Sequence, residues 1–283
     1  MVVSIIFSIF AGVFNKLKTF AVRSIYCILA LVMIICLGCE WRLRPDDNNQ
    51  LESQITIDRY DVTERLFLTT GDYAALQQLK TIYPMQTRIL IEDVLRLGLV
   101  SDSDIDIDFL SFFQDSTLQK LLADVELEYA DLSDVQRQLS MAFERLKAME
   151  PNLELPVVYT QVGSLDQSII VNDNLLGISL DKYLGFDYPL YLKYDYSEWQ
   201  RQSMTRQYIV PDCLSFYLLS LYPLQNYKQA TEIQRHWHIA KVQHVVNTLM
   251  GKHFFEDEMV RLVAARLKGQ SGLRLDEVMA LSM

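Results

Sequence analysis

The stretch LLGISLDKYLGFDYPLY, Leu175 to Tyr191, is the most informative segment of the chain. Its apolar run, Leu176 to Leu180, predicts a short strand, and Asp181 follows that strand as an acidic turn. The segment then contains a glycine and a proline, which interrupt regular structure. We therefore expect a buried strand that leads directly into a compact, tyrosine-rich turn.

The N-terminus has the features of a secretory signal peptide over residues 1–38. Basic residues at 16, 18 and 23 precede an apolar run of about fifteen residues, shorter than the roughly twenty that a spanning helix needs. The run ends at Leu37, and Gly38 and Cys39 follow at once. This pattern resembles a bacterial lipobox, although Cys36 stands where leucine is usual. It predicts cleavage after Gly38 and acylation of Cys39, for example by palmitate; the alternative is a membrane anchor with an incidental cysteine.

Charge and cysteine content restrict the function classes. The chain has 26 basic and 36 acidic residues, a net charge of −10. Loss of residues 1–38 removes three basic residues and no acidic ones, which leaves 23 against 36 and a net charge of −13. Phosphate backbones are bound by Lys and Arg, so nucleic acid is a poor candidate partner. Only Cys213 remains beside Cys39, so no disulfide within the domain is expected.

Three regions follow from these patterns. Residues 39–52 comprise the lipidated cysteine and a polar tether. Its acidic pair at 46–47 fits either a solvated linker or a signal that routes lipoproteins to the cell surface. Residues 53–283 form one domain, with a helical half at about 53–151 and a small sheet with helices at about 152–283.

Capping residues, turn residues and apolar patterns in the sequence predict the positions of most helices and strands. In the first half we expect a strand at 54–58 and helices at 61–68, 73–83 (capped by Asp72), 85–97 (opened by Pro84), 115–129 and 133–149 (with a capping box of Ser133 and Gln136). In the second half we expect a hairpin of 155–162 with 167–171, a third strand at 178–180, and helices at 211–222, 232–250 and 256–267. The predicted fold class is α+β, predominantly helical with a small antiparallel sheet.

Metal and nucleophile patterns are weak. Aspartates alternate from Asp102 to Asp108, but the EF-hand spacing would need a glycine at Ile107 and a glutamate at Phe113. His236 and His244 share a helix face, whereas His238 points about 160° away from His236, at about 100° per residue, so a single zinc site is not expected. Cys213 has no base near it in sequence, and no spacing singles out a pair of carboxylates as in a glycosidase. We predict no metal, no cofactor and no catalytic residue.

Nine of the fifteen tyrosines lie between residues 183 and 227, with Trp199 among them. Two interpretations remain open. A glycan- or peptide-binding surface would expose contiguous rings from Tyr188, Tyr191, Tyr194, Tyr196 and Trp199. A structural role would bury those rings and leave a broader apolar patch as the interaction surface.

Several motifs together resemble the gliding-motility lipoprotein GldB family. They are GISLDKYLGFDYPLY, the YIVPD that opens a later helix, the pair Gly251-Lys252, IDRYD at 57–61 and TGDYAALQQLKTIYP at 70–84. The resemblance implies a lipoprotein of the outer membrane, facing the periplasm or the cell surface, that serves gliding and the type IX secretion machinery. On this basis we expect a non-catalytic scaffold or adaptor with envelope protein partners. Its candidate partner surface comprises Asp181, Tyr183, Gly185, Tyr188, Pro189, Tyr191 and Asp212.

The family is also distantly similar to zinc-peptidase folds, in which a helix carries two histidines at i and i+4 and a glutamate. The comparable helix here, at 211–222, has neither histidine nor glutamate, and HExxH occurs nowhere in the chain. The resemblance therefore implies, at most, a degenerate zincin-like scaffold without its metal site. A glycan- or peptide-binding lipoprotein is the first alternative function, and a divergent metal-peptidase-like hydrolase is the second.

Overall fold

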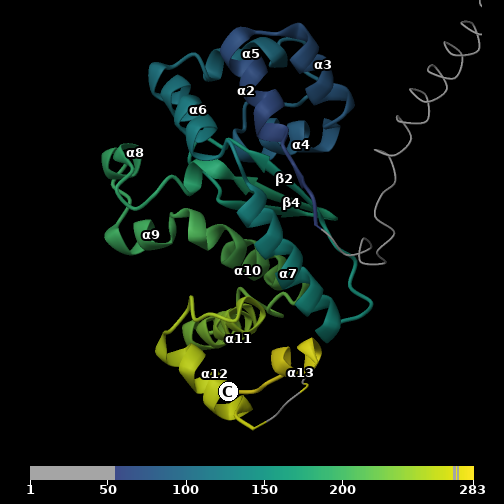
Figure 1. The fold of residues 1–283 in the computed structure, drawn as a ribbon, viewed down its shortest axis with the longest axis vertical. Helices are drawn as coiled ribbons and strands as arrows, with labels where there is room; N and C mark the ends of the chain where they lie inside the picture. Colours follow the sequence, from purple (N-terminus) through teal and green to yellow (C-terminus); the bar gives the residue numbers. More distant parts are fainter. Residues whose placement is uncertain (1–54, 270–271, 273) are drawn as a thin grey trace, which may run out of the picture. The chain divides into compact units, whose positions relative to one another are not determined.

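A computed structural model describes residues 55–269, 272 and 274–283 (Figure 1). The predicted signal peptide, Gly38, Cys39 and the tether lie outside the described residues. The first half contains α2 (Tyr60–Thr70), α3 (Tyr73–Thr81), α4 (Pro84–Arg88), a π-helical segment (Ile89–Val94), α5 (Ile105–Phe112), α6 (Ser116–Glu128) and α7 (Ser133–Met149). The second half contains α8 (Pro189–Lys193), α9 (Glu198–Ser203), α10 (Ile209–Leu221), α11 (Glu232–Met250), α12 (Glu258–Leu267) and α13 (Leu275–Met279).

Four short strands form one sheet: β1 (Ile57–Asp58), β2 (Val157–Gln161), β3 (Ile169–Asn172) and β4 (Leu175–Ser179). Their order is β1-β2-β4-β3. The predicted α+β, mainly helical class is confirmed, but the sheet is mixed rather than antiparallel. β2 pairs parallel with β1 and β4, and only β3 and β4 are antiparallel. The hairpin prediction for 155–162 with 167–171 is therefore wrong, because β3 turns back onto β4 and β4 inserts beside β2.

Side-chain caps explain why several helices begin where they do. Asp72 accepts the Ala75 N–H at the start of α3, and Thr231 and Gln234 form a capping box on α11. Pro84 opens α4 as predicted, but the helix expected over 85–97 changes to π geometry at Ile89. There the Leu95 N–H donates to the Leu90 carbonyl, five residues back.

The capping box predicted for Ser133 and Gln136 does not form. Asp131 accepts the Ser133 N–H instead, and Gln136 Oε1 accepts the Ile57 N–H at 3.2 Å. Gln136 thus links α7 to the edge strand β1. A local motif could not reveal this bond, because its partner lies 79 residues away in the sequence.

The sheet is held against helices from both halves of the chain. α2 packs against β2, and α10 packs against β3, β4 and α7 (Figure 1). One continuous core contains the buried face of α7, formed by Val135, Leu139, Ala142, Phe143 and Leu146. Among the described residues, no helix is long and apolar enough to cross a membrane.

Candidate functional site

Asp181 is fully buried at the end of β4, where the sequence predicted an acidic turn. Its carboxylate accepts backbone N–H groups from Gly163 at 2.9 Å and Leu165 at 2.5 Å. Ser164 and Leu165 have φ angles of 54° and 66°, so this loop is wrapped tightly around the carboxylate. Burial raises the Asp181 pKa, although the two N–H bonds oppose that shift. Asp181 therefore fixes a loop and is not exposed at the surface.

Tyr191 is the centre of the turn that follows. Its ring is fully buried, and its hydroxyl donates to the Asp181 carbonyl at 2.6 Å and accepts the Leu184 N–H at 2.9 Å. Tyr188 and Tyr196 each meet it edge-on, with ring centroids 5.1 and 5.7 Å away. The Tyr188 hydroxyl donates to Asp124 at 2.8 Å, and so connects the turn to α6.

Pro189 and Gly185 shape the backbone of this turn. Pro189 occupies the first turn of α8, where its missing N–H costs nothing. Gly185 has a φ of 114° and donates its N–H to the Met204 carbonyl at 3.0 Å. This bond joins the turn to the segment before α10.

Tyr183 and Asp212 lie together, which the sequence did not reveal. The Tyr183 hydroxyl donates to Asp212 Oδ2 at 2.9 Å. Removal from water raises the Asp212 pKa to about 7, and the hydrogen bond from Tyr183 opposes that rise. Its carboxyl group therefore titrates near neutral pH, which is a property that binding and catalytic groups share.

A small pocket of about 160 Å³ opens beside this pair. We call it the Asp212 pocket; its lining includes Ser168, Lys182, Tyr183, Trp199, Met204 and Asp212. The Lys182 ammonium donates to the Leu165 carbonyl at 3.1 Å and to the Tyr196 hydroxyl at 3.0 Å. Trp199, on α9, is 80% exposed at this pocket. Ser168 lies in no motif that would have singled it out, and Lys182 lies within the family motif but was not among the predicted site residues.

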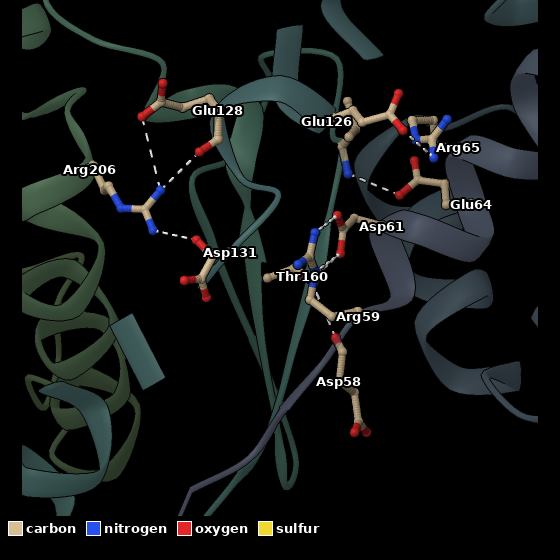
Figure 2. A network of polar contacts seen from close by, with 11 residues as sticks. Asp58, Arg59, Asp61, Glu64, Arg65, Glu126, Glu128, Asp131, Thr160 and Arg206 are labelled. Atoms are coloured by element: carbon tan, nitrogen blue, oxygen red, sulfur yellow. Dashed lines mark hydrogen bonds and ion pairs between the residues drawn. The ribbon is translucent and has the colours of Figure 1, made fainter. Parts of the chain in front are cut away.

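Arg206 closes the other side of the turn. It pairs with Asp134 at 2.6 Å. It also donates to the carbonyls of Glu128 and Asp131, between α6 and α7 (Figure 2). Its guanidinium also lies 5.1 Å from the centre of the Tyr129 ring. The Tyr129 hydroxyl in turn donates to the Tyr183 carbonyl at 2.5 Å. Sequence reasoning missed Arg206, because its partners are more than seventy residues away.

A second polar network joins α2 to β2 (Figure 2). Asp61 pairs with Arg59 at 2.8 Å and accepts the Thr160 hydroxyl at 2.5 Å. Glu64 is fully buried and accepts the Val162 N–H at 3.0 Å, while its Oε1 atom has no partner. Burial raises the Glu64 pKa well above its ordinary value. These groups hold α2 to β2, which is a structural use of the charges.

The structure does not bring the candidate metal ligands together. His236 is exposed and lies 3.9 Å from Glu232, whereas the buried His238 hydrogen-bonds the Tyr222 carbonyl at 2.8 Å. Within residues 55–269, 272 and 274–283, no group of three or more His, Cys, Asp and Glu side chains could hold a metal ion. Cys213 is fully buried, and burial raises the pKa of its thiol well above the ordinary value. A thiol in such surroundings is a poor nucleophile.

These observations define the class of the protein. It is a mainly helical α+β domain with a mixed sheet, and strand β4 leads into a buried turn that contains Asp181 and Tyr191. A family model described as gliding motility protein GldB matches residues 41–256 of the chain. The chain belongs to the GldB family, and it is thus a gliding-motility-related lipoprotein of the cell envelope. Searches of curated proteins and of solved structures found no match. The zincin-like likeness accordingly has no structural support.

Proposed function

We propose that this chain is a non-catalytic adaptor, tethered by lipid to the outer membrane and working in the envelope machinery of gliding and type IX secretion. Family membership supports the link to gliding motility. The observation that carries the adaptor role is that the family motif forms its hydrogen bonds within the domain. The polar groups of Asp181, Tyr188 and Tyr191 form hydrogen bonds within the domain. The motif therefore builds a rigid support for the surface segment that follows it.

The contact surface then lies on what this support presents to solvent. The α8–α9 segment, residues 189–203, exposes Leu192 by 51%, Tyr194 by 53% and Trp199 by 80%. Exposed aromatic and aliphatic side chains on a rigid support are typical of interaction hot spots. We therefore propose that the partner surface comprises Leu192, Tyr194 and Trp199 in place of Asp181 and Tyr191.

In-cell photo-crosslinking tests this role. Benzoylphenylalanine replaces Trp199 in the lipidated chain, and replaces the equally exposed Leu127 on α6 as the matched control. We expect a crosslink to an envelope protein from position 199, absent from position 127 and lost when Leu192 is changed to Glu. Equal crosslinks from both positions, or none from position 199, would contradict the adaptor role.

A peptide-binding function is the second candidate, favoured by the position of Trp199 beside the Asp212 pocket. A glycan platform receives less support, because Tyr191 is buried and Tyr188 and Tyr196 pack edge-on against it. For the hydrolase alternative, metal analysis of protein purified without chelators is decisive. Near-stoichiometric zinc would contradict the non-catalytic proposal.

A further inference from the structure

Asp212 has an unusual position for a carboxylate in an acidic protein. It lines a pocket, yet no Lys or Arg pairs with it among the described residues. Its one hydrogen-bond partner in that part of the chain is the Tyr183 hydroxyl, which occupies Oδ2 and leaves Oδ1 without a protein partner. A partly desolvated carboxylate of this kind is stabilised by a cation.

Lys182, which also lines the pocket, does not supply that cation. Its ammonium is committed to the Leu165 carbonyl and the Tyr196 hydroxyl, and it lies 4.5 Å from the centre of the Tyr196 ring. Above pH 7 the ionised Asp212 carboxylate therefore has no ion-pair partner within the described part of the chain.

The wall of the pocket suits a cationic group as well. Trp199 contributes an indole that is 80% exposed, and the faces of Trp and Tyr rings attract ammonium and guanidinium groups. A volume of about 160 Å³ admits a narrow side chain but not a folded element. A carboxylate next to an exposed indole is thus a small receptor for a positively charged side chain.

We propose that the Asp212 pocket binds a basic side chain, lysine or arginine, of a partner protein, with Asp212 as the counter-ion and Trp199 as the aromatic wall. The identity of the binder as a partner protein rests on the adaptor function proposed above. The net charge of −10 of the chain also favours the approach of a basic segment.

The test uses the full-length chain in detergent, with its three tryptophans replaced by 5-fluorotryptophan. The probe is N-acetyl-lysine-methylamide, and its uncharged control is the norleucine analogue. At pH 8 we expect the lysine probe to shift the ¹⁹F signal of Trp199 in a saturable way. The signal of Trp237, whose indole donates to the Leu281 carbonyl, should stay in place.

Two variants make the result specific. Asp212→Asn keeps the acceptor for Tyr183 but removes the charge, so the lysine probe should bind at least about tenfold more weakly, equivalent to ~1.4 kcal/mol. Glu198→Gln removes a charge next to Trp199 in sequence without changing the pocket lining, and it should bind like the parent. Unchanged binding by Asp212→Asn, equal binding of the norleucine probe, or no shift at all would overturn the proposal.

The result of this binding test can be distinguished from the result of the crosslinking test of the adaptor function. A lysine-dependent shift without a crosslink from position 199 would leave the pocket as a cation receptor and contradict the adaptor. A crosslink without a lysine-dependent shift would support the adaptor and overturn the pocket assignment.

Discussion

Asp181 illustrates how one side chain determines the position of a loop. Because it accepts the N–H groups of Gly163 and Leu165, its removal leaves two buried donors unpaired. Each unpaired buried donor costs about 1–3 kcal/mol, so Asp181→Ala should lower the free energy of unfolding by about 3 kcal/mol. Urea denaturation measures the change. Asp187→Ala, at a side chain that is 86% exposed, is the control and should stay within about 0.5 kcal/mol. A loss as small as that control would contradict the assignment.

Asp212 should make the stability of the domain depend on pH. The groups near its carboxyl are the Tyr183 hydroxyl, the Cys213 thiol and, across the pocket, Lys182. Its pKa is raised from 3.8 to about 7 in the folded chain, so the folded state binds the proton more tightly than the unfolded state. This contribution to stability is present in full below pH 3.8 and is lost as the pH rises through 7.

The variant Asp212→Asn is neutral at every pH. We therefore expect it to melt at a higher temperature than the parent at pH 8, and by a smaller margin at pH 5. Thermal melts at both pH values measure the difference. A variant less stable than the parent at pH 8 would mean that the ionised carboxylate stabilises the fold.

At the scale of elements, β2 and β4 have a tight contact at one residue pair. Tyr159 is opposite Gly177, and a Cβ atom on Gly177 would lie 2.5 Å from Cζ of the Tyr159 ring. Gly177→Ala should therefore cost about 1–3 kcal/mol or more through overpacking. The cost should shrink when Tyr159 is shortened to leucine, which a double-mutant cycle measures by denaturation. Additive costs in the cycle would show that Tyr159 does not restrict this site.

The elements also show what the sequence could predict. Signals contained within one turn, such as Asp72 before α3 and Gly251 after α11, located helix ends correctly, because cap and backbone are neighbours in sequence. Strand pairing depends on partners far apart, so the insertion of β4 beside β2 was not predictable. For the same reason the sequence suggested Tyr183 and Asp212 separately but could not join them, since 29 residues separate them.

At the scale of the whole molecule, the lipid at Cys39 is predicted to decide where the domain resides. Cys39→Ser should leave the fold unchanged, because the core that the structure describes is formed by residues after position 39, with Ile55 as the first that it describes. The variant should move from the membrane pellet to the soluble envelope fraction, as measured by immunoblot of fractions washed with high salt. Ser140→Ala serves as a control that keeps the cysteine and should stay in the pellet. A Cys39→Ser chain that still pellets would contradict the lipid tether.

The edge strand β1 has a mechanical consequence. Tension transmitted along the backbone from the N-terminal side reaches Ile55 and β1 before the rest of the described chain. β1 is bound by its parallel pairing with β2, by Gln136 at the Ile57 N–H and by Ser140 at the Ile55 carbonyl. A pull along the strand loads these bonds in shear, so they share the force and do not open one by one. The point at which the proposed lipid tether would pull on this domain is therefore tied to α7, the longest helix of its first half.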